Sequence, residues 1–250
     1  MRKYLFMMFI LLASASWAAS EKELLGEANK YYMAQEFNRA AAAYEQILAS
    51  GKESAEIYFN LGNAYYKTGD YVKAILNYER AKRIEPQNED IEFNLQIANR
   101  FVVDNLEQLP RPFFARWWSN LANLESAGGW AKISTGCFIL FLILLGSYFF
   151  SRTLRLRKIS FFGSMLMLFF LIISFSLGYH QFTIMKKNNT ALIQCPRVTV
   201  KSSPSSTGTD LFLIHEGLKV EITDGLNTWK EIQLSDGNKG WIADSCLVRI

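Results

Sequence analysis

Apolar residues are unevenly spread along the 250 residues, and their pattern divides the chain into segments. Uncharged apolar runs cover residues 4–15, 133–150 and 159–179. Between the first two runs, apolar positions recur mainly with the helical period of 3.6 residues. After the third run, short β-branched and aromatic stretches alternate with turn residues. We therefore expect a helical region over residues 20–108 and a β-rich region over residues 188–250.

The helical region contains a unit that repeats with a period of 34 residues. Its most complete copy lies in residues 55–88 and is marked by Tyr58, Leu61, Gly62, Tyr65, Ala74, Tyr78, Ala81 and Pro86. A backward shift of 34 residues aligns Ala28 with Gly62, and a forward shift aligns Gln96 with it. The unit resembles the tetratricopeptide repeat. This resemblance implies an all-α solenoid of two units and a capping helix over residues 20–108.

The repeat resemblance also implies a peptide groove lined by the first helix of each unit. The side chains expected there are Asn29, Tyr32, Phe59, Asn60, Asn63, Tyr66, Lys67 and Asn94. Asparagines can both donate to and accept from a peptide backbone, and aromatic rings supply contact area. A solvated helix face would carry the same polar residues. Leu25, Asp90 and Asn94 stand where a carboxylate clamp needs basic residues, which argues against that binding mode.

The remaining apolar runs predict export and membrane insertion. Residues 1–19 combine Arg2 and Lys3, a short apolar stretch and small residues, the pattern of a signal peptide. Residues 133–150 and 159–179 are long enough for transmembrane helices, and the alternative is a pair of buried core helices.

The loop at residues 151–158 carries four basic residues, against three on the outer flanks. This bias predicts a cytoplasmic loop, with both soluble domains in the periplasm of a bacterial inner membrane.

An aromatic segment separates the repeats from the first apolar run. In residues 109–130, Phe113, Phe114, Trp117 and Trp118 recur at roughly helical spacing. Such a juxtamembrane helix favours the lipid headgroup level. Docking of a partner's membrane helix is the alternative interpretation.

Six β-rich runs between turn residues predict a small all-β barrel over residues 188–250, and they cover residues 198–200, 211–214, 219–222, 229–234, 240–242 and 247–250. Its Glu216-Gly217 turn, Trp229 and the Gly240-Trp241 pair resemble the bacterial SH3 domain. That resemblance implies a ligand face at Trp229 and Trp241, for cell-wall peptides or protein partners. Both tryptophans would also suit the core of so small a barrel.

Charge and candidate chemistry narrow the functional classes. The net charge of +4 comes from the membrane-flanking part: residues 110–189 hold 9 basic and 1 acidic residue, whereas residues 20–109 hold 10 basic and 15 acidic. Neither soluble region therefore has the basic footprint of a nucleic-acid binder. No phosphate loop, zinc cluster or nucleophile elbow is present, so we expect no enzyme, cofactor or metal site. The spacing of Cys195 and Cys246 does not decide between a disulfide, free thiols and a redox-cycling pair.

The predicted fold class is a multidomain membrane protein with a tetratricopeptide solenoid, a two-helix transmembrane hairpin and an SH3-like barrel. Over its full length this order resembles the BatE proteins of the bacterial Bat aerotolerance operon. The resemblance rests on the repeats at residues 21–100, the Pro-Phe-Phe-Ala-Arg-Trp-Trp run and the C-terminal Gly-Trp-Ile sequence. It implies a scaffold that binds other Bat membrane proteins in tolerance of oxidative stress. An envelope sensor that binds peptidoglycan peptides is the alternative.

Overall fold

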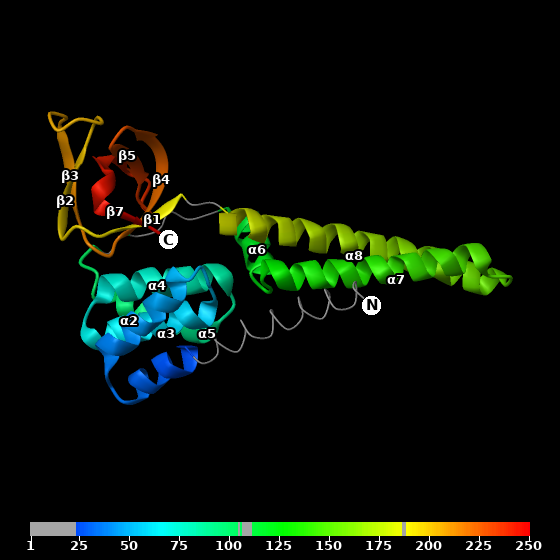
Figure 1. Cartoon of the computed structure of the whole chain (residues 1–250). Coiled ribbons are helices and arrows are strands. Elements are labelled where there is room, and N and C mark those ends of the chain that lie inside the picture. Colours follow the sequence, from blue (N-terminus) through cyan, green and yellow to red (C-terminus); the bar gives the residue numbers. More distant parts are fainter. Residues whose placement is uncertain (1–23, 105, 107–111, 187–188) are drawn as a thin grey trace, which may run out of the picture. The chain divides into compact units, whose positions relative to one another are not determined.

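The computed structural model describes residues 24–104, 106, 112–186 and 189–250 (Figure 1). The predicted signal peptide at residues 1–19 lies outside the described residues. The chain divides into two compact units. Unit 1 joins the helical repeats to the C-terminal sheet, and unit 2 contains residues 83–87 and 109–188.

Within the described residues, the helical part of unit 1 consists of five consecutive helices. They are residues 24–33, α2 (Phe37–Ala49), α3 (Ala55–Thr68), α4 (Tyr71–Ile84) and α5 (Glu89–Asn99). Local residues define the helix ends: the Ser54 hydroxyl accepts a hydrogen bond from the Ile57 backbone N–H at 3.2 Å, and Gly69 ends α3 with φ +83°. Asn88 caps α5 in the same way as Ser54 caps α3.

Small residues lie at the closest helix contacts of the repeats, as the 34-residue pattern predicts. A Cβ added at Gly62 would lie 2.7 Å from two ring carbons of Tyr78. Ala28 and Ala74 have no exposed surface. Gln96, at the equivalent position of α5, is exposed and donates to Glu92 at 3.0 Å. A long side chain therefore stands where a further repeat would need a small one, which suits α5 as the end of the array.

The C-terminal part of unit 1 is one antiparallel sheet of seven strands in the order β3-β2-β6-β5-β4-β1-β7. The strands are β1 (Thr190–Ile193), β2 (Arg197–Lys201), β3 (Asp210–His215), β4 (Lys219–Leu226), β5 (Trp229–Gln233), β6 (Lys239–Ala243) and β7 (Leu247–Arg249). The sheet is open, with β3 and β7 at its edges, so this strand order lacks the closure expected of a barrel. The sequence pattern missed β1 as a strand.

The β1–β7 pair has apolar residues on both faces. Ala191 and Ile193 pack in the core of the sheet, whereas Leu192 packs in the helical core together with Val248 of β7. Alternate side chains of a strand point to opposite faces, so the pair lies between the two cores. A disulfide between Cys195 and Cys246 joins the end of β1 to the start of β7, with the two Cα atoms 5.1 Å apart.

Polar contacts also hold the sheet against the repeats within unit 1. Lys219 Nζ donates to Glu79 at 2.6 Å, and Arg80 donates to the carbonyl oxygen of Arg249 at 2.8 Å. The Asp104 carboxylate accepts from the His215 backbone N–H at 2.6 Å and lies 2.9 Å from His215 Nδ1.

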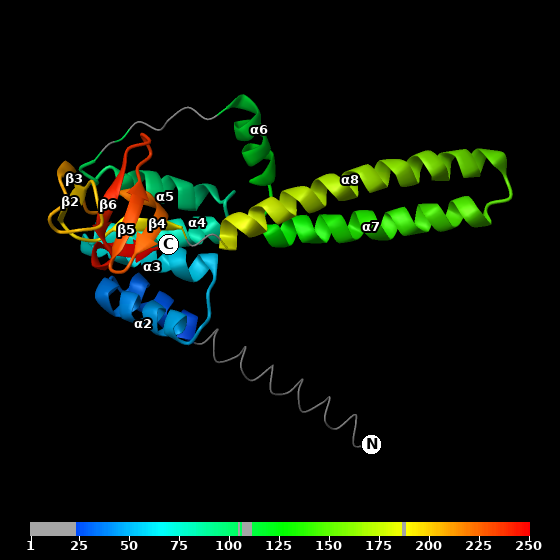
Figure 2. The ribbon, with the colours of Figure 1, turned by 90° about the horizontal axis from the view of Figure 1, so that it is seen from above.

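Unit 2 contains α6 (Phe113–Ala122), α7 (Ala127–Phe150) and α8 (Leu154–Lys186). Figures 1 and 2 both show α7 and α8 side by side as a hairpin. The two helices have 24 and 33 residues and are long and apolar enough to cross a membrane. Only 6% and 17% of their most apolar windows are buried, unlike a core helix of a soluble protein. Because α8 begins at Leu154, residues 154–158 of the predicted loop are helical.

Small polar residues line the contact between α7 and α8. Ser134 donates to Ser174 at 3.0 Å, and Ser160 donates to Ser147 at 3.0 Å. A Cβ added at Gly178 would lie 3.0 Å from Trp130 Cβ. In a lipid environment, where the hydrophobic effect does not drive helices together, helices typically pair through small residues and hydroxyl hydrogen bonds.

The predicted aromatic juxtamembrane segment forms α6, which is attached to the hairpin at its C-terminal end. Gln181 of α8 donates to the carbonyl oxygen of Ala122 and to Asn123 Oδ1, each at 2.8 Å. Phe113, Phe114 and Trp117 are exposed. The exposed rings agree with either predicted partner, lipid or a membrane helix of another protein.

Candidate functional site

The predicted groove residues come together on the first helix of each repeat. Asn60 Nδ2 lies 3.5 Å from Asn29 Oδ1, and Asn94 Nδ2 donates to Asn63 Oδ1 at 2.8 Å. These contacts link residues 24–33 with α3, and α3 with α5. We call the surface formed by Asn29, Asn60, Asn63 and Asn94 the asparagine face.

Two asparagines of this face also hold the repeats together. Tyr44 donates to Asn29 Oδ1 at 2.5 Å, and Tyr78 donates to Asn63 Oδ1 at 2.7 Å. The two pairs are equivalent, since each member is 34 residues from its counterpart. Asn29 and Asn63 therefore orient the second helix of their own unit. Asn94 also hydrogen-bonds to Tyr78, whereas Asn60 has no hydrogen bond to a tyrosine hydroxyl in the described part of the chain. Asn60 is therefore the asparagine of this face that is best placed to meet a peptide.

The aromatic residues expected in the groove have internal ring partners. Tyr32 packs edge-to-face on Phe37 at 5.3 Å, and Phe59 lies 5.9 Å from the Tyr78 ring. Tyr66 contacts Phe101 at 6.1 Å. Tyr32, Phe59 and Tyr66, the three predicted groove aromatics, are partly buried, whereas Lys67 is exposed. Each ring is thus held by a neighbour, and pre-ordered rings lose less conformational entropy when a ligand binds.

Burial raises the pKa of several tyrosines in the repeats. Burial of the ring raises the pKa of Tyr44 to about 12. Burial also raises the pKa of Tyr78 well above its ordinary value. The pKa of Tyr65 is raised too, first by burial and then by its hydrogen bond to the Glu45 carboxylate. The tyrosine hydroxyls remain protonated donors throughout the physiological range.

The predicted ligand face of the sheet carries Trp229 and Trp241 on neighbouring strands. Glu231 is paired with Trp241, and Trp229 lies two residues before Glu231, so both tryptophans share one face of β5–β6. Ile232 and Ile242 occupy the opposite face and belong to the core cluster. Neither tryptophan is in that cluster, and both are partly exposed. This placement favours a surface role over the core role that the sequence left open.

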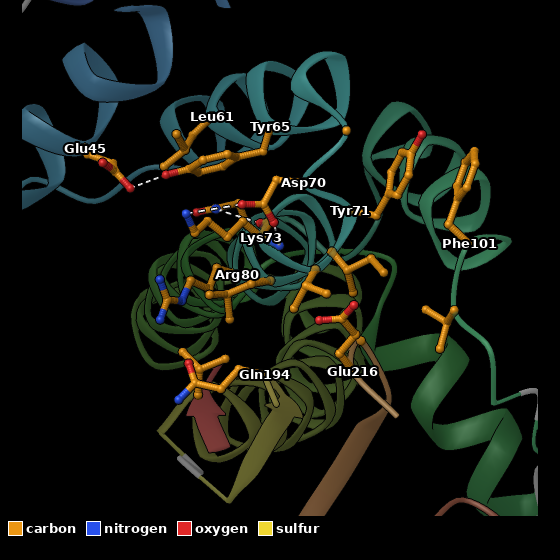
Figure 3. A pocket seen from close by; sticks show the side chains of 18 of the residues that line it. Glu45, Leu61, Tyr65, Asp70, Tyr71, Lys73, Arg80, Phe101, Gln194 and Glu216 are labelled. Atoms are coloured by element: carbon orange, nitrogen blue, oxygen red, sulfur yellow. Dashed lines mark hydrogen bonds and ion pairs between the residues drawn. The ribbon is translucent and has the colours of Figure 1, made fainter. Parts of the chain in front are cut away.

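A cavity of about 810 Å³ lies elsewhere in unit 1, between the repeats and the sheet (Figure 3). We call it the cleft. Its helical wall comes mainly from α4, and its other wall comes from Gln194, Glu216, Gly217 and Val248. None of the eight predicted groove residues lines it. The sequence did not predict the cleft, because its two walls come from segments more than ninety residues apart.

Aromatic and charged side chains converge on the cleft. The rings of Tyr71 and Phe101 stack with centroids 3.8 Å apart and planes 7° apart. Lys73 Nζ pairs with Asp70 at 3.2 Å and lies 4.9 Å above the Tyr65 ring. A pocket of this size with a few convergent polar groups is typical of a binding site.

The comparisons with known proteins support the repeat prediction. Residues 25–89 match the tetratricopeptide repeat family. The match covers both predicted units and the start of α5, and this part of the chain is a tetratricopeptide repeat region. A search of curated proteins gives no match. Tetratricopeptide repeats are scaffolds for protein–protein interaction, so the comparison favours a protein partner.

Proposed function

We propose that this chain is a membrane-anchored scaffold that binds a partner protein at the asparagine face of its tetratricopeptide repeats. The observation that carries the proposal is the repeat match at residues 25–89, combined with the asparagines that line one face of those repeats. Asparagine side chains can pair with both N–H and C=O groups of a bound peptide.

The arrangement of unit 1 supports the membrane anchoring and the orientation. Its repeat segment precedes the two apolar helices and its sheet follows them, yet both belong to one compact unit. Two crossings return the chain to the side from which it started, so a spanning hairpin is compatible with this unit. The disulfide of the sheet suits an oxidising compartment. These features support a bacterial inner-membrane protein with both soluble parts in the periplasm.

The proposed context comes from the resemblance to BatE proteins, and the partners would then be other Bat membrane proteins. The C-terminal sheet would be an SH3-like domain, for which the Glu216-Gly217 turn and the two tryptophans are the supporting residues. The exposed rings of α6 would contact membrane lipid.

Co-purification from membranes tests the scaffold. Asn60→Ala combined with Lys67→Ala alters the asparagine face and the exposed lysine beside it, without removing an acceptor of a tyrosine hydroxyl. We expect partners to be lost with this variant and kept with Asn38→Ala combined with Gln46→Ala, which changes exposed residues of α2. An identical partner set for both variants, with intact folding, would reject the asparagine face as the binding surface.

The alternative function is an envelope sensor that binds peptidoglycan peptides through the sheet. The observation that favours it is the shared outer face of Trp229 and Trp241. Full-length protein in detergent should then be retained on purified peptidoglycan and released by Trp241→Ala. If wild-type protein is not retained, this alternative is rejected.

A further inference from the structure

The cleft has a chemical character distinct from that of the asparagine face. The Tyr71–Phe101 ring pair lies on its helical side, and Phe101 remains half exposed. The Glu216-Gly217 turn faces the same region, because a Cβ added at Gly217 would lie 3.0 Å from Val102 Cγ2. Val102 directly follows Phe101 in the chain, so the Glu216-Gly217 turn lies against the segment that carries Phe101. Figure 3 shows the rings of Tyr71 and Phe101 beside each other, and Glu216 on the same wall of the cleft as Gln194.

The charges that line the cleft leave a surplus of carboxylates. Two of its charged groups neutralise each other, since Lys73 pairs with Asp70. Arg80 is engaged with the Arg249 carbonyl and lies over the Tyr58 ring. The Glu45 carboxylate accepts from the Tyr65 hydroxyl, an uncharged donor. Within the described part of the chain, the Glu216 side chain is exposed and makes no ion pair. The side chains that line the cleft include three carboxylates, of Glu45, Asp70 and Glu216, and two basic groups, of Lys73 and Arg80, so one carboxylate is in excess.

We propose that the cleft binds an arginine side chain of an extended segment in a partner protein. A guanidinium group stacks on aromatic faces and pairs with carboxylates through a planar fork of donors. Phe101 offers an accessible ring backed by Tyr71, and Glu216 offers the carboxylate. The segment would contact the repeats and the sheet together, so its binding would stabilise their association. This site is separate from the asparagine face, and its test does not depend on the proposed scaffold function.

Methyl NMR of the full-length protein in detergent micelles tests the site directly. The probe is the peptide acetyl-Gly-Arg-Gly-amide. We expect dose-dependent shifts of the methyl signals of Val102 and Val248, which flank the cleft, and no shifts for Ile232 and Ile242 in the sheet core. The same peptide with citrulline keeps the shape and lacks the charge, so it should produce no shifts. Absent shifts with the arginine peptide, or equal shifts with both peptides, would overturn the proposal.

Substitutions of single residues identify which side chains of the cleft bind the arginine peptide. Glu216→Gln removes the charge-assisted hydrogen bond and should raise the Kd of the arginine peptide about tenfold. Phe101→Leu should weaken binding in the same direction. Glu53→Gln, an exposed change outside the cleft, should leave the Kd unchanged, as should the Asn60→Ala and Lys67→Ala pair. An unchanged Kd in Glu216→Gln would contradict the assignment.

Discussion

Gly62 shows at the residue scale how the repeat pattern acts through packing. The 34-residue alignment predicts a small residue there, and the structure confirms this with the Tyr78 ring 2.7 Å from the site of a Cβ. The ring is buried and cannot move outward without disturbing the core. The sequence could identify this residue because its requirement is local to one helical hairpin.

Gly62→Ala should destabilise the repeats by about 1–3 kcal/mol, since overpacking outweighs the gain in helix propensity. The control is Gly26→Ala, because a Cβ at Gly26 meets nothing within 4 Å. That change should stabilise the helix by up to about 1 kcal/mol. Hydrogen exchange of α3 and α4 measures the first effect, and hydrogen exchange of residues 24–33 measures the second. A stabilising Gly62→Ala would contradict the packing described here.

The asparagines show what the sequence could not resolve at this scale. Repeat spacing placed Asn29 and Asn63 on the expected helix face, and contacts across that face are seen. It did not reveal that each accepts a hydrogen bond from a tyrosine of its own unit. Helical periodicity identifies a face but not the side chain that approaches it from a second helix.

Tyr44 leads to a prediction on alkaline stability. Its pKa is raised by burial to about 12 in the folded state, above the value near 10 of an unfolded chain. Between these values the unfolded state loses its proton first, so the stability due to the protonated hydroxyl is complete below about pH 10 and falls as the pH rises through about 12.

Unfolding measured against pH should show wild type losing stability more steeply than Tyr44→Phe over this window. If the unfolding free energies of the two proteins ran parallel up to pH 12, the Tyr44 hydroxyl would not be buried from water as described.

At the scale of elements, six of the seven strands were expected from β-branched runs between turn residues. The exception is β1, in which Ala191, Leu192 and Ile193 are three successive apolar residues. All three are buried because the strand lies between two cores. Such a strand lacks the alternation of apolar and polar residues that marks a half-exposed strand. The first residues of α8 were also expected to lie in a loop, because a run of basic residues between two apolar segments is typical of a loop.

The disulfide should matter most for β7, an edge strand of three residues that pairs with β1 alone among the described strands. Replacing Cys195 and Cys246 with alanine should lower the free energy of unfolding by about 2–4 kcal/mol. Hydrogen exchange should increase in β7 and in the α4 surface that it covers. Cys137→Ser on α7 is the matched control and should leave both regions unchanged. Equal exchange in β7 with and without the disulfide would refute this role.

At the scale of the whole molecule, the order of segments was predictable but the association of the repeats with the sheet was not. The two parts are separated by the apolar hairpin, and contacts such as Lys219 with Glu79 join residues 140 positions apart. Sequence periodicity carries no information on such pairs. The cleft arises only from this association, which is why no motif pointed to it.

The central claim is that a partner protein binds at the asparagine face. The most direct measurement is site-specific photo-crosslinking in intact cells, with a benzophenone amino acid at Lys67 beside that face or at Gln46 on α2; both positions are exposed. A discrete adduct should form from position 67 and not from position 46, and Asn60→Ala should reduce it. Adducts of equal yield from both positions, or none from position 67, would contradict the account.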